Sequence, residues 1–320
     1  MKKITHIFFL TIALAHNYTA IAMEQPITHL LVIPGQNGMG GQNVDTVLPY
    51  FAHHGLKHEI ETPLQNPDFG QTNCLTLLKE KIATLKNKGT LHENDHLVIH
   101  GSSQGTATTI NYAAHNPHNI KAIILESVML TGNSAIFHTI DKMMLADSCN
   151  LPELSYYALP YTAKSLFPNY SPTGEQPIFT ADKLPQDLPI IILHDTKDFQ
   201  LSFKDAQALY AFLTHTKKNK YVYLFAQESP QGAHINLLKH RNKKEIAAIN
   251  TILQLHNILP LEPLSPQTIA DMIDLKEYQP EPQQEWLDHF ANILNKEKNL
   301  NSACSSLDST NISSSWCTTS

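Results

Sequence analysis

The sequence contains almost no arginine: Arg241 is the only one among its 23 basic residues. A single chain therefore cannot build the cluster of guanidinium groups with which proteins clamp phosphate or carboxylate groups. The charge balance is also negative, with 29 acidic residues in a chain of 320. This composition argues against nucleic acid and other polyanions as partners, because their binding needs a positively charged surface.

Cysteine is scarce, and none of the four cysteines has C-x-x-C spacing. The sequence thus lacks the usual pattern of a redox pair or a zinc ribbon. Four cysteines allow three disulfide connectivities, here among Cys74, Cys149, Cys304 and Cys317. Because Cys304 and Cys317 are near neighbours, they are the pair that we expect in an oxidising compartment.

The apolar run at the amino terminus is too short to cross a membrane. It spans the nine residues 7–15, whereas a spanning helix needs about 20. Two lysines precede the run, and Ala20 and Ala22 follow it in A-x-A spacing, as in a secretory signal peptide. We expect cleavage near Ala22 and export to a periplasm or out of the cell, which leaves 21 basic and 29 acidic residues. Residues 13–15 offer a second cleavage site, and an uncleaved anchor is the alternative.

Short apolar runs alternate with segments of helical spacing along most of the chain. Strands are expected at residues 28–33, 57–61, 96–100, 120–126, 189–194 and 220–225, and helices between them at 73–86, 105–115 and 202–217. Nearly all-apolar strands that alternate with helices are typical of a parallel sheet covered on both faces. The sequence therefore predicts an α/β fold with a mostly parallel sheet of about six strands.

The alternation lapses between about residues 127 and 185. This insertion is too long for an ordinary connection and is rich in proline and aromatic residues, so we expect a lid over one edge of the sheet. Its aromatic residues could line an apolar pocket or only pack the insertion onto the domain. They include Tyr156, Tyr157, Tyr161 and Phe167.

Three helices are expected after the last strand. The first covers about residues 232–257, the second starts at Ser265, and the third carries one apolar face made of Trp286, Leu287, Phe290, Ile293 and Leu294. The Ser/Thr-rich residues 301–320 are expected to be disordered. The predicted organisation is thus a signal peptide at 1–22, one domain with its lid at 23–300, and a tail at 301–320.

The segment HENDH, residues 92–96, fits the H-E-x-x-H pattern of zinc proteases. That pattern requires a helix, so that both histidine rings reach one ion at about 2.0 Å. Here the segment runs straight into an expected strand, where residues four apart are separated by about 13 Å at roughly 3.3 Å per residue. A polar loop accounts for the segment, and a zinc hydrolase is kept as an alternative function.

The segment LVIHGSSQGTA, residues 97–107, contains G-x-S-x-G between a predicted strand and a predicted helix. This pattern places a serine nucleophile on a sharp strand-to-helix turn, with its hydroxyl exposed at the carboxyl end of the sheet. Gly101 and Gly105 would leave room where a side chain would collide with the neighbouring strand and helix. The pattern makes Ser103 the candidate nucleophile.

With this turn, residues 28–257 resemble an α/β-hydrolase, a family whose Ser, Asp and His follow one another in chain order. The segment HDTKD after strand 189–194 is similar to the family's acid loop, with Asp198 in the position of the acid and Asp195 as the alternative. His234 follows the next strand and is the only histidine between His215 and His240. The resemblance thus implies a catalytic triad of Ser103, Asp198 and His234.

The resemblance also implies an oxyanion hole. One backbone donor would be the N–H of Gln104, and the other would come from the glycine-rich loop VIPGQNGMGG, at Gln36 or alternatively Asn37. The family usually has histidine before the first glycine of this loop, and Pro34 stands there instead. A phosphate-binding loop is the other interpretation, but the Lys-Ser/Thr ending of that motif is missing.

The sequence therefore predicts an exported serine hydrolase that cleaves an acyl ester and needs no cofactor or metal. The expected substrate is a small-molecule or lipid-like acyl compound. A thioesterase or a serine peptidase would use the same residues, and a catalytically silent binding protein can share the fold. Oligomeric state and contact with a membrane surface are not predicted.

Overall fold

The structure is a computed structural model that describes residues 26–35, 44–60, 68–145, 169–230, 232–260 and 273–308. The predicted signal peptide at residues 1–22 and the helix expected from Ser265 lie outside these ranges.

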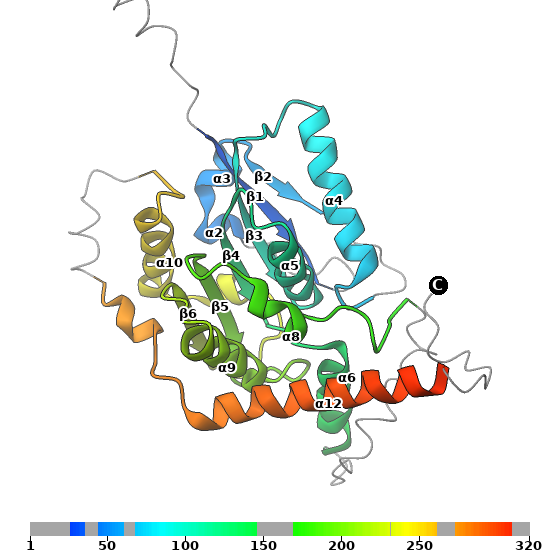
Figure 1. Ribbon diagram of the computed structural model, residues 1–320. Helices are drawn as coiled ribbons and strands as arrows, with labels where there is room; N and C mark the ends of the chain where they lie inside the picture. Colours follow the sequence, from blue (N-terminus) through cyan, green and yellow to red (C-terminus); the bar gives the residue numbers. More distant parts are fainter. Residues whose placement is uncertain are drawn as a thin grey trace, which may run out of the picture.

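Six strands form one sheet in the order β2-β1-β3-β4-β5-β6, and every neighbouring pair is parallel (Figure 1). Their bounds are β1 Thr28–Ile33, β2 Lys57–Glu59, β3 His96–Ser102, β4 Ile120–Glu126, β5 Ile190–Asp195 and β6 Val222–Gln227. Each strand begins within two residues of its predicted start. The predicted parallel α/β fold is confirmed.

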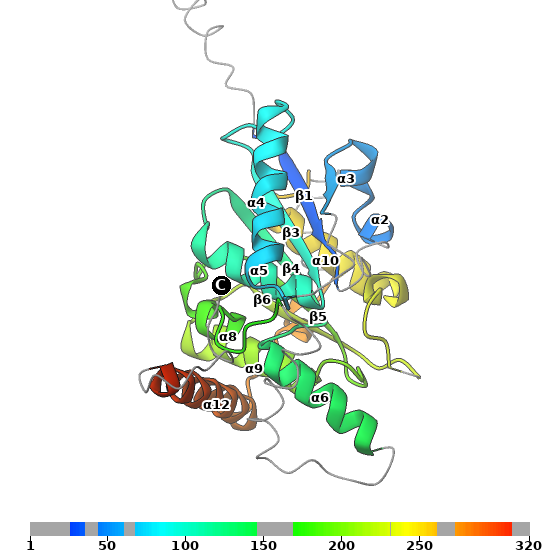
Figure 2. The same ribbon diagram turned by 90° about the vertical axis from the view of Figure 1, so that its right-hand side faces the viewer.

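Helices cover both faces of the sheet (Figure 2). One face packs against α4, α5, α8 and α9, and the other against α2, α3 and α10. The bounds are α2 Val44–Val47, α3 Pro49–His53, α4 Thr72–Asn87, α5 Gln104–His115, α8 Pro177–Thr180, α9 Phe203–Ala211 and α10 Lys243–Leu255.

Side chains alternate between two cores along each strand, because successive residues of a strand point to opposite faces. In β1, Leu31 and Ile33 enter the core under α4 and α5, whereas Leu30 and Val32 enter the core under α10. Full burial of one such side chain contributes about 1.5–3 kcal/mol. Both faces of the sheet are therefore apolar, and its polar groups are concentrated at the strand ends.

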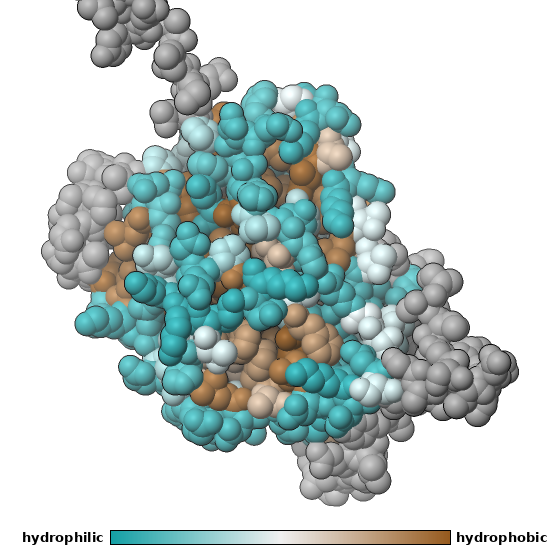
Figure 3. All heavy atoms as spheres, in the orientation of Figure 1, coloured by the Kyte–Doolittle hydropathy of each residue, from teal (hydrophilic) through white to brown (hydrophobic). Residues whose placement is uncertain are grey.

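The last helix, α12 (Gln284–Asp308), docks through the apolar stripe that the sequence predicted. Trp286, Phe290 and Ile293 are buried in the core that also holds α9. The ring of Phe290 stacks on Phe212 with 4.2 Å between centroids. Figure 3 shows apolar residues gathered between α8 and α12 on a face that is otherwise largely hydrophilic.

Two predicted boundaries near the carboxyl end are wrong. The helix expected from residue 232 begins only at Lys243, because Asn236 adopts a left-handed conformation (φ 63°) and the side chain of Asn242 caps the helix at Glu245 N–H. The tail expected to be disordered from residue 301 starts as helix, since α12 continues to Asp308. In this extension, Ser302 donates its hydroxyl hydrogen to the carbonyl of Lys298 one turn earlier.

The insertion between β4 and β5 is described only at its two ends. These ends contain α6 (Gly132–Leu145), α8 and a short 3-10 turn, Ala181–Lys183. The aromatic residues expected to line the lid, at positions 156–167, lie outside the described residues. The lid thus stays a prediction.

In the described part of the chain, no helix combines the length and the apolar character needed to cross a bilayer. Cys74 is a free, buried thiol. The expected pairing of Cys304 with Cys317 cannot be followed, because Cys317 lies outside the described residues.

Candidate active site

Ser103 is the single residue between the end of β3 and the start of α5. Its backbone has φ 52° and ψ −121°, a conformation that residues other than glycine rarely adopt. Such strain persists only where the surrounding structure enforces it, and it is concentrated at functional sites. The sharp strand-to-helix turn predicted from G-x-S-x-G is therefore present.

The two glycines of this turn are needed for packing. A Cβ atom at Gly101 would lie 2.3 Å from the carbonyl oxygen of Gly105, and one at Gly105 would lie 2.3 Å from the carbonyl oxygen of Ile33. Real Cβ contacts do not become that short. The collision predicted for larger residues is confirmed. The backbone of Gly105 packs closely against Ile33 at the end of β1.

His234 connects Ser103 to Asp198. Its Nε2 lies 2.9 Å from Ser103 Oγ, and its Nδ1 lies 2.9 Å from Oδ2 and 3.1 Å from Oδ1 of Asp198. Since a carboxylate only accepts hydrogen bonds, Nδ1 carries the hydrogen, and Nε2 is left to accept from the serine hydroxyl. In the sequence, Ser103 and Asp198 are 95 positions apart, and Asp198 and His234 are 36 positions apart. The fold brings these three residues together.

Asp198 is held by backbone donors of its own loop. Its Oδ1 accepts from Gln200 N–H at 2.8 Å and from Leu201 N–H at 3.0 Å. Burial by itself would raise the pKa of Asp198, but the hydrogen bond and electrostatic attraction of His234, together with the backbone hydrogen bond from Leu201, outweigh burial and lower the pKa. The carboxylate is therefore ionised at neutral pH.

Asp195, the alternative acid, has different partners. It accepts from Lys197 N–H at 2.8 Å and from Ser229 N–H at 3.1 Å. The bond from Ser229 joins the end of β5 to the loop after β6. The described contacts of His234 with a carboxylate are those with Asp198.

His194 is a further residue of the site that the sequence did not single out. Its Nδ1 accepts from Val128 N–H at 3.1 Å, and its Nε2 lies 3.2 Å from the carbonyl oxygen of Leu201. It therefore links the end of β4 to the loop that carries Asp198. The only sequence signal was its place as the first residue of HDTKD, and nothing in that pattern distinguishes it from other buried histidines.

Of the two expected oxyanion donors, one lies among the described residues. Gln104 is the first residue of α5, where backbone N–H groups have no intrahelical partner, and it directly follows Ser103. Gln36, its alternative Asn37 and the rest of the glycine-rich loop lie outside the described residues.

The segment HENDH forms no helix. It contains a turn, and β3 begins at His96. Asp95 holds this segment in place by accepting from Ile27 N–H at 3.0 Å and from His92 N–H at 2.7 Å. Within the described ranges, no three histidine, cysteine or acidic residues are grouped to hold a metal ion.

An exposed aromatic ring flanks the histidine. Phe199 is 49% exposed, and its ring lies edge-on to His234 with 6.5 Å between centroids. Behind the acid loop lies a cavity of about 580 Å³, lined by His138, Asp141, Thr196, Lys197, Asp198, Ser202, Phe203, Lys204 and Gln207. An exposed apolar ring and a cavity with charged lining residues thus both adjoin the site.

No family model and no curated protein matches this sequence. Its structure is similar to that of an esterase from Pyrococcus furiosus, with 14% identity, 72% of this chain and 82% of that chain covered, and a TM-score of 0.50. It is also similar to an acylaminoacyl peptidase from Pyrococcus horikoshii, with 13% identity, 77% of this chain and 40% of that chain covered, and a TM-score of 0.49. At such low identity, similarity shows only the fold.

Proposed function

We propose that this chain, which has the α/β-hydrolase fold, is a serine hydrolase that cleaves acyl esters. The observation that supports the proposal most strongly is the hydrogen-bonded row from Ser103 Oγ through His234 to Asp198, which begins at a strained turn. A serine hydroxyl is a poor nucleophile at neutral pH, and an adjacent base that is itself oriented by a carboxylate activates it.

In the proposed reaction, Ser103 Oγ attacks the ester carbonyl while Nε2 of His234 takes the hydroxyl proton. The same nitrogen then returns the proton to the leaving alcohol, so that an acyl-serine remains. Water attacks this ester while Nε2 of His234 takes a proton from it, and the return of that proton to Ser103 Oγ releases the acid and restores the free serine. Asp198 keeps the hydrogen on Nδ1 and stabilises the imidazolium that forms in both steps.

Backbone donors would stabilise the oxyanion of the tetrahedral intermediates. Gln104 N–H stands at the start of α5, where the helix dipole also favours negative charge. The second donor in this proposal is the N–H of Gln36. Each such donor contributes about 3–4 kcal/mol to lowering the barrier.

The proposed substrate is an ester with an apolar acyl or alcohol group. The exposed ring of Phe199 beside His234 supports this choice, because it offers an apolar contact next to the reacting atoms. Activity on p-nitrophenyl esters should therefore increase from acetate to butyrate and longer chains.

Export is part of the proposal and depends only on the sequence of residues 1–22. Mass analysis of the protein recovered from a host that secretes it tests this part: the expected mature chain starts at or near Met23. A recovered chain that still starts at Met1 would contradict export by cleavage.

Labelling with a fluorophosphonate probe tests the nucleophile, since such probes react with activated serines. The mature protein should be labelled on Ser103, as mapped by mass spectrometry, and the Ser103→Ala variant should not. A folded wild-type protein that stays unlabelled and inactive on p-nitrophenyl esters would favour a silent binding protein on the same fold.

A further inference from the structure

A buried carboxylate at the end of β4 joins the two segments that carry Ser103 and His234. Glu126 lies beside Ser102 in the parallel register of β3 and β4. Its Oε2 accepts from the hydroxyl of Ser102 at 2.6 Å, and its Oε1 accepts from the backbone N–H of Leu237. One side chain therefore binds the residue before the nucleophile and a residue three positions after the histidine.

The backbone at this point strengthens the connection. The carbonyl oxygen of Glu126 accepts from Ser103 N–H at 2.8 Å. The next residue, Ser127, donates its hydroxyl hydrogen to the carbonyl oxygen of His234, and its N–H donates to the carbonyl oxygen of Leu193 in β5. Two consecutive residues thus contact the backbone of the nucleophile, of the base and of the strand that leads to the acid.

Ser127 adopts a left-handed backbone conformation, with φ 56°. This conformation is unfavourable for residues other than glycine. Ser127 keeps this conformation while its hydroxyl bonds to the carbonyl oxygen of His234, and such strain persists only where the surrounding structure enforces it.

The charge of Glu126 matches the donors around it. The side chain is 1% exposed, and Nε2 of His100, another buried residue, lies 3.3 Å from its Oε2. Burial would raise the pKa of Glu126, but His100 and the two hydrogen-bond donors outweigh burial and lower the pKa. The ionised carboxylate can accept from Ser102 and Leu237 at once, whereas an amide at this position would have one oxygen acceptor and one donor.

We infer that Glu126 and Ser127 are positioning residues, which set the distance between Ser103 Oγ and Nε2 of His234. Proton transfer needs these atoms at hydrogen-bond distance, and a misplacement of about 1 Å can lower the rate 100-fold. Glu126 and Ser127 contact the segments that carry Ser103 and His234, and not the reacting atoms. The inference depends on the proposed function of Ser103 and His234.

Two substitutions test the inference on the mature protein. Glu126→Gln keeps the shape and removes the charge and one acceptor, and Ser127→Gly removes the hydroxyl while tolerating φ 56°. On p-nitrophenyl butyrate, each variant should lose about 10-fold or more in kcat with KM within about twofold. Fluorophosphonate labelling of Ser103 should slow by a similar factor.

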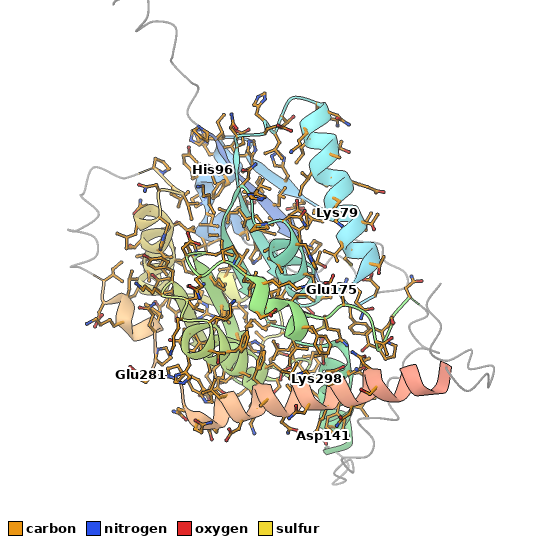
Figure 4. The ribbon with its side chains drawn as sticks, in the orientation of Figure 1. Lys79, His96, Asp141, Glu175, Glu281 and Lys298 are labelled. Atoms are coloured by element: carbon orange, nitrogen blue, oxygen red, sulfur yellow. The ribbon has the colours of Figure 1, made fainter. Side chains whose placement is uncertain are left out.

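Asp95 provides a matched control. It is also a buried carboxylate that accepts from two donors and lies 3.3 Å from a histidine Nε2, that of His29. Asp95 directly precedes His96, the first residue of β3. Figure 4 shows His96 far from Asp141, a residue that lines the same cavity as Asp198 of the acid loop. Asp95→Asn should lower the thermal midpoint and leave kcat unchanged.

The outcomes separate the inference from the proposed function. Folded Glu126→Gln and Ser127→Gly variants with wild-type kcat and labelling rates would overturn the inference while the labelled wild-type protein still supports a serine hydrolase. An equal loss of kcat in Asp95→Asn would also overturn it, since any buried carboxylate would then have the effect. If Glu126→Gln fails to fold, Ser127→Gly decides alone. An unlabelled, inactive wild-type protein would overturn both.

Discussion

Nε2 of His194 lies 3.7 Å from Oδ2 of Asp198, and both side chains are completely buried. Because Val128 N–H donates to Nδ1 of His194, the hydrogen of the neutral ring must be on Nε2, from which it is donated to the carbonyl oxygen of Leu201. Burial lowers the pKa of His194 and so keeps the ring neutral. The ring thus connects the acid loop to the end of β4 without adding a positive charge beside Asp198.

Replacing His194 with leucine should leave Val128 N–H and the carbonyl oxygen of Leu201 without this partner. We expect the free energy of unfolding to fall by about 1–3 kcal/mol, the usual effect of unpaired buried polar groups. His194→Gln should lose less, because an amide can accept from the one and donate to the other. Urea unfolding measures both, and equal stabilities of the two variants would contradict this role.

Ser103→Ala should lower kcat by at least about a thousandfold, because it removes the hydroxyl that Nε2 of His234 contacts. The thermal midpoint should stay within a few degrees of the wild-type value, since the substitution removes one hydroxyl from a half-buried position. Ser103→Gly should be inactive as well but as stable as wild type or more so, because glycine relieves the strain at φ 52°. Turnover that survives in either variant would exclude Ser103 as the nucleophile.

The two aspartates of HDTKD should respond differently to conversion to asparagine. Asp198→Asn should lower kcat by several orders of magnitude, because an amide no longer stabilises the imidazolium and can favour the wrong tautomer of His234. Asp195→Asn should mainly lower stability, since Asp195 binds loop N–H groups at Lys197 and Ser229. Steady-state kinetics and thermal unfolding of both variants test this prediction. A larger loss of kcat in Asp195→Asn than in Asp198→Asn would identify Asp195 as the acid.

Stability should decrease in mild acid because of His58. Burial, with His29 and Lys81 nearby, lowers the pKa of His58 to about 4, whereas an unfolded histidine has a pKa of about 6.5. The unfolded chain therefore binds a proton that the folded protein excludes, so this stability is fully present above pH 6.5 and is lost as the pH falls toward 4.

The thermal midpoint of His58→Gln should accordingly change less between pH 6.5 and 4 than that of the wild-type protein. His118→Gln, at an exposed position, is the control and should follow the wild-type curve. Parallel curves for His58→Gln and wild type would show that His58 does not carry this dependence.

His92→Ala should change kcat by no more than a few-fold, because His92 precedes a turn and its described role is to donate its backbone N–H to Asp95. Treatment with EDTA should likewise leave turnover unchanged. Activity that is lost in this variant and restored by added zinc would instead support the zinc hydrolase alternative.

Some features of this protein are determined by its sequence alone. Runs of branched apolar residues between Thr28 and Gln227 specify the strands, because successive residues of each strand are buried in the cores on opposite faces of the sheet. The parallel order of the strands follows from the helices between them. The turn at Ser103 could be predicted because only glycine, which has no Cβ atom, fits the close contacts at positions 101 and 105. These signals are local, or depend on a pattern that recurs along the chain.

Only the tertiary structure decided which long-range partners meet. The sequence favoured Asp198 over Asp195 through the resemblance of HDTKD to a family motif, but only the fold shows which of these two carboxylates meets His234. The sequence also assigned no role to His194, Glu126 or Ser127, since their roles come from hydrogen bonds to segments 66 to 111 positions away. Such bonds exist only after the sheet has assembled, when the carboxyl ends of its parallel strands lie side by side.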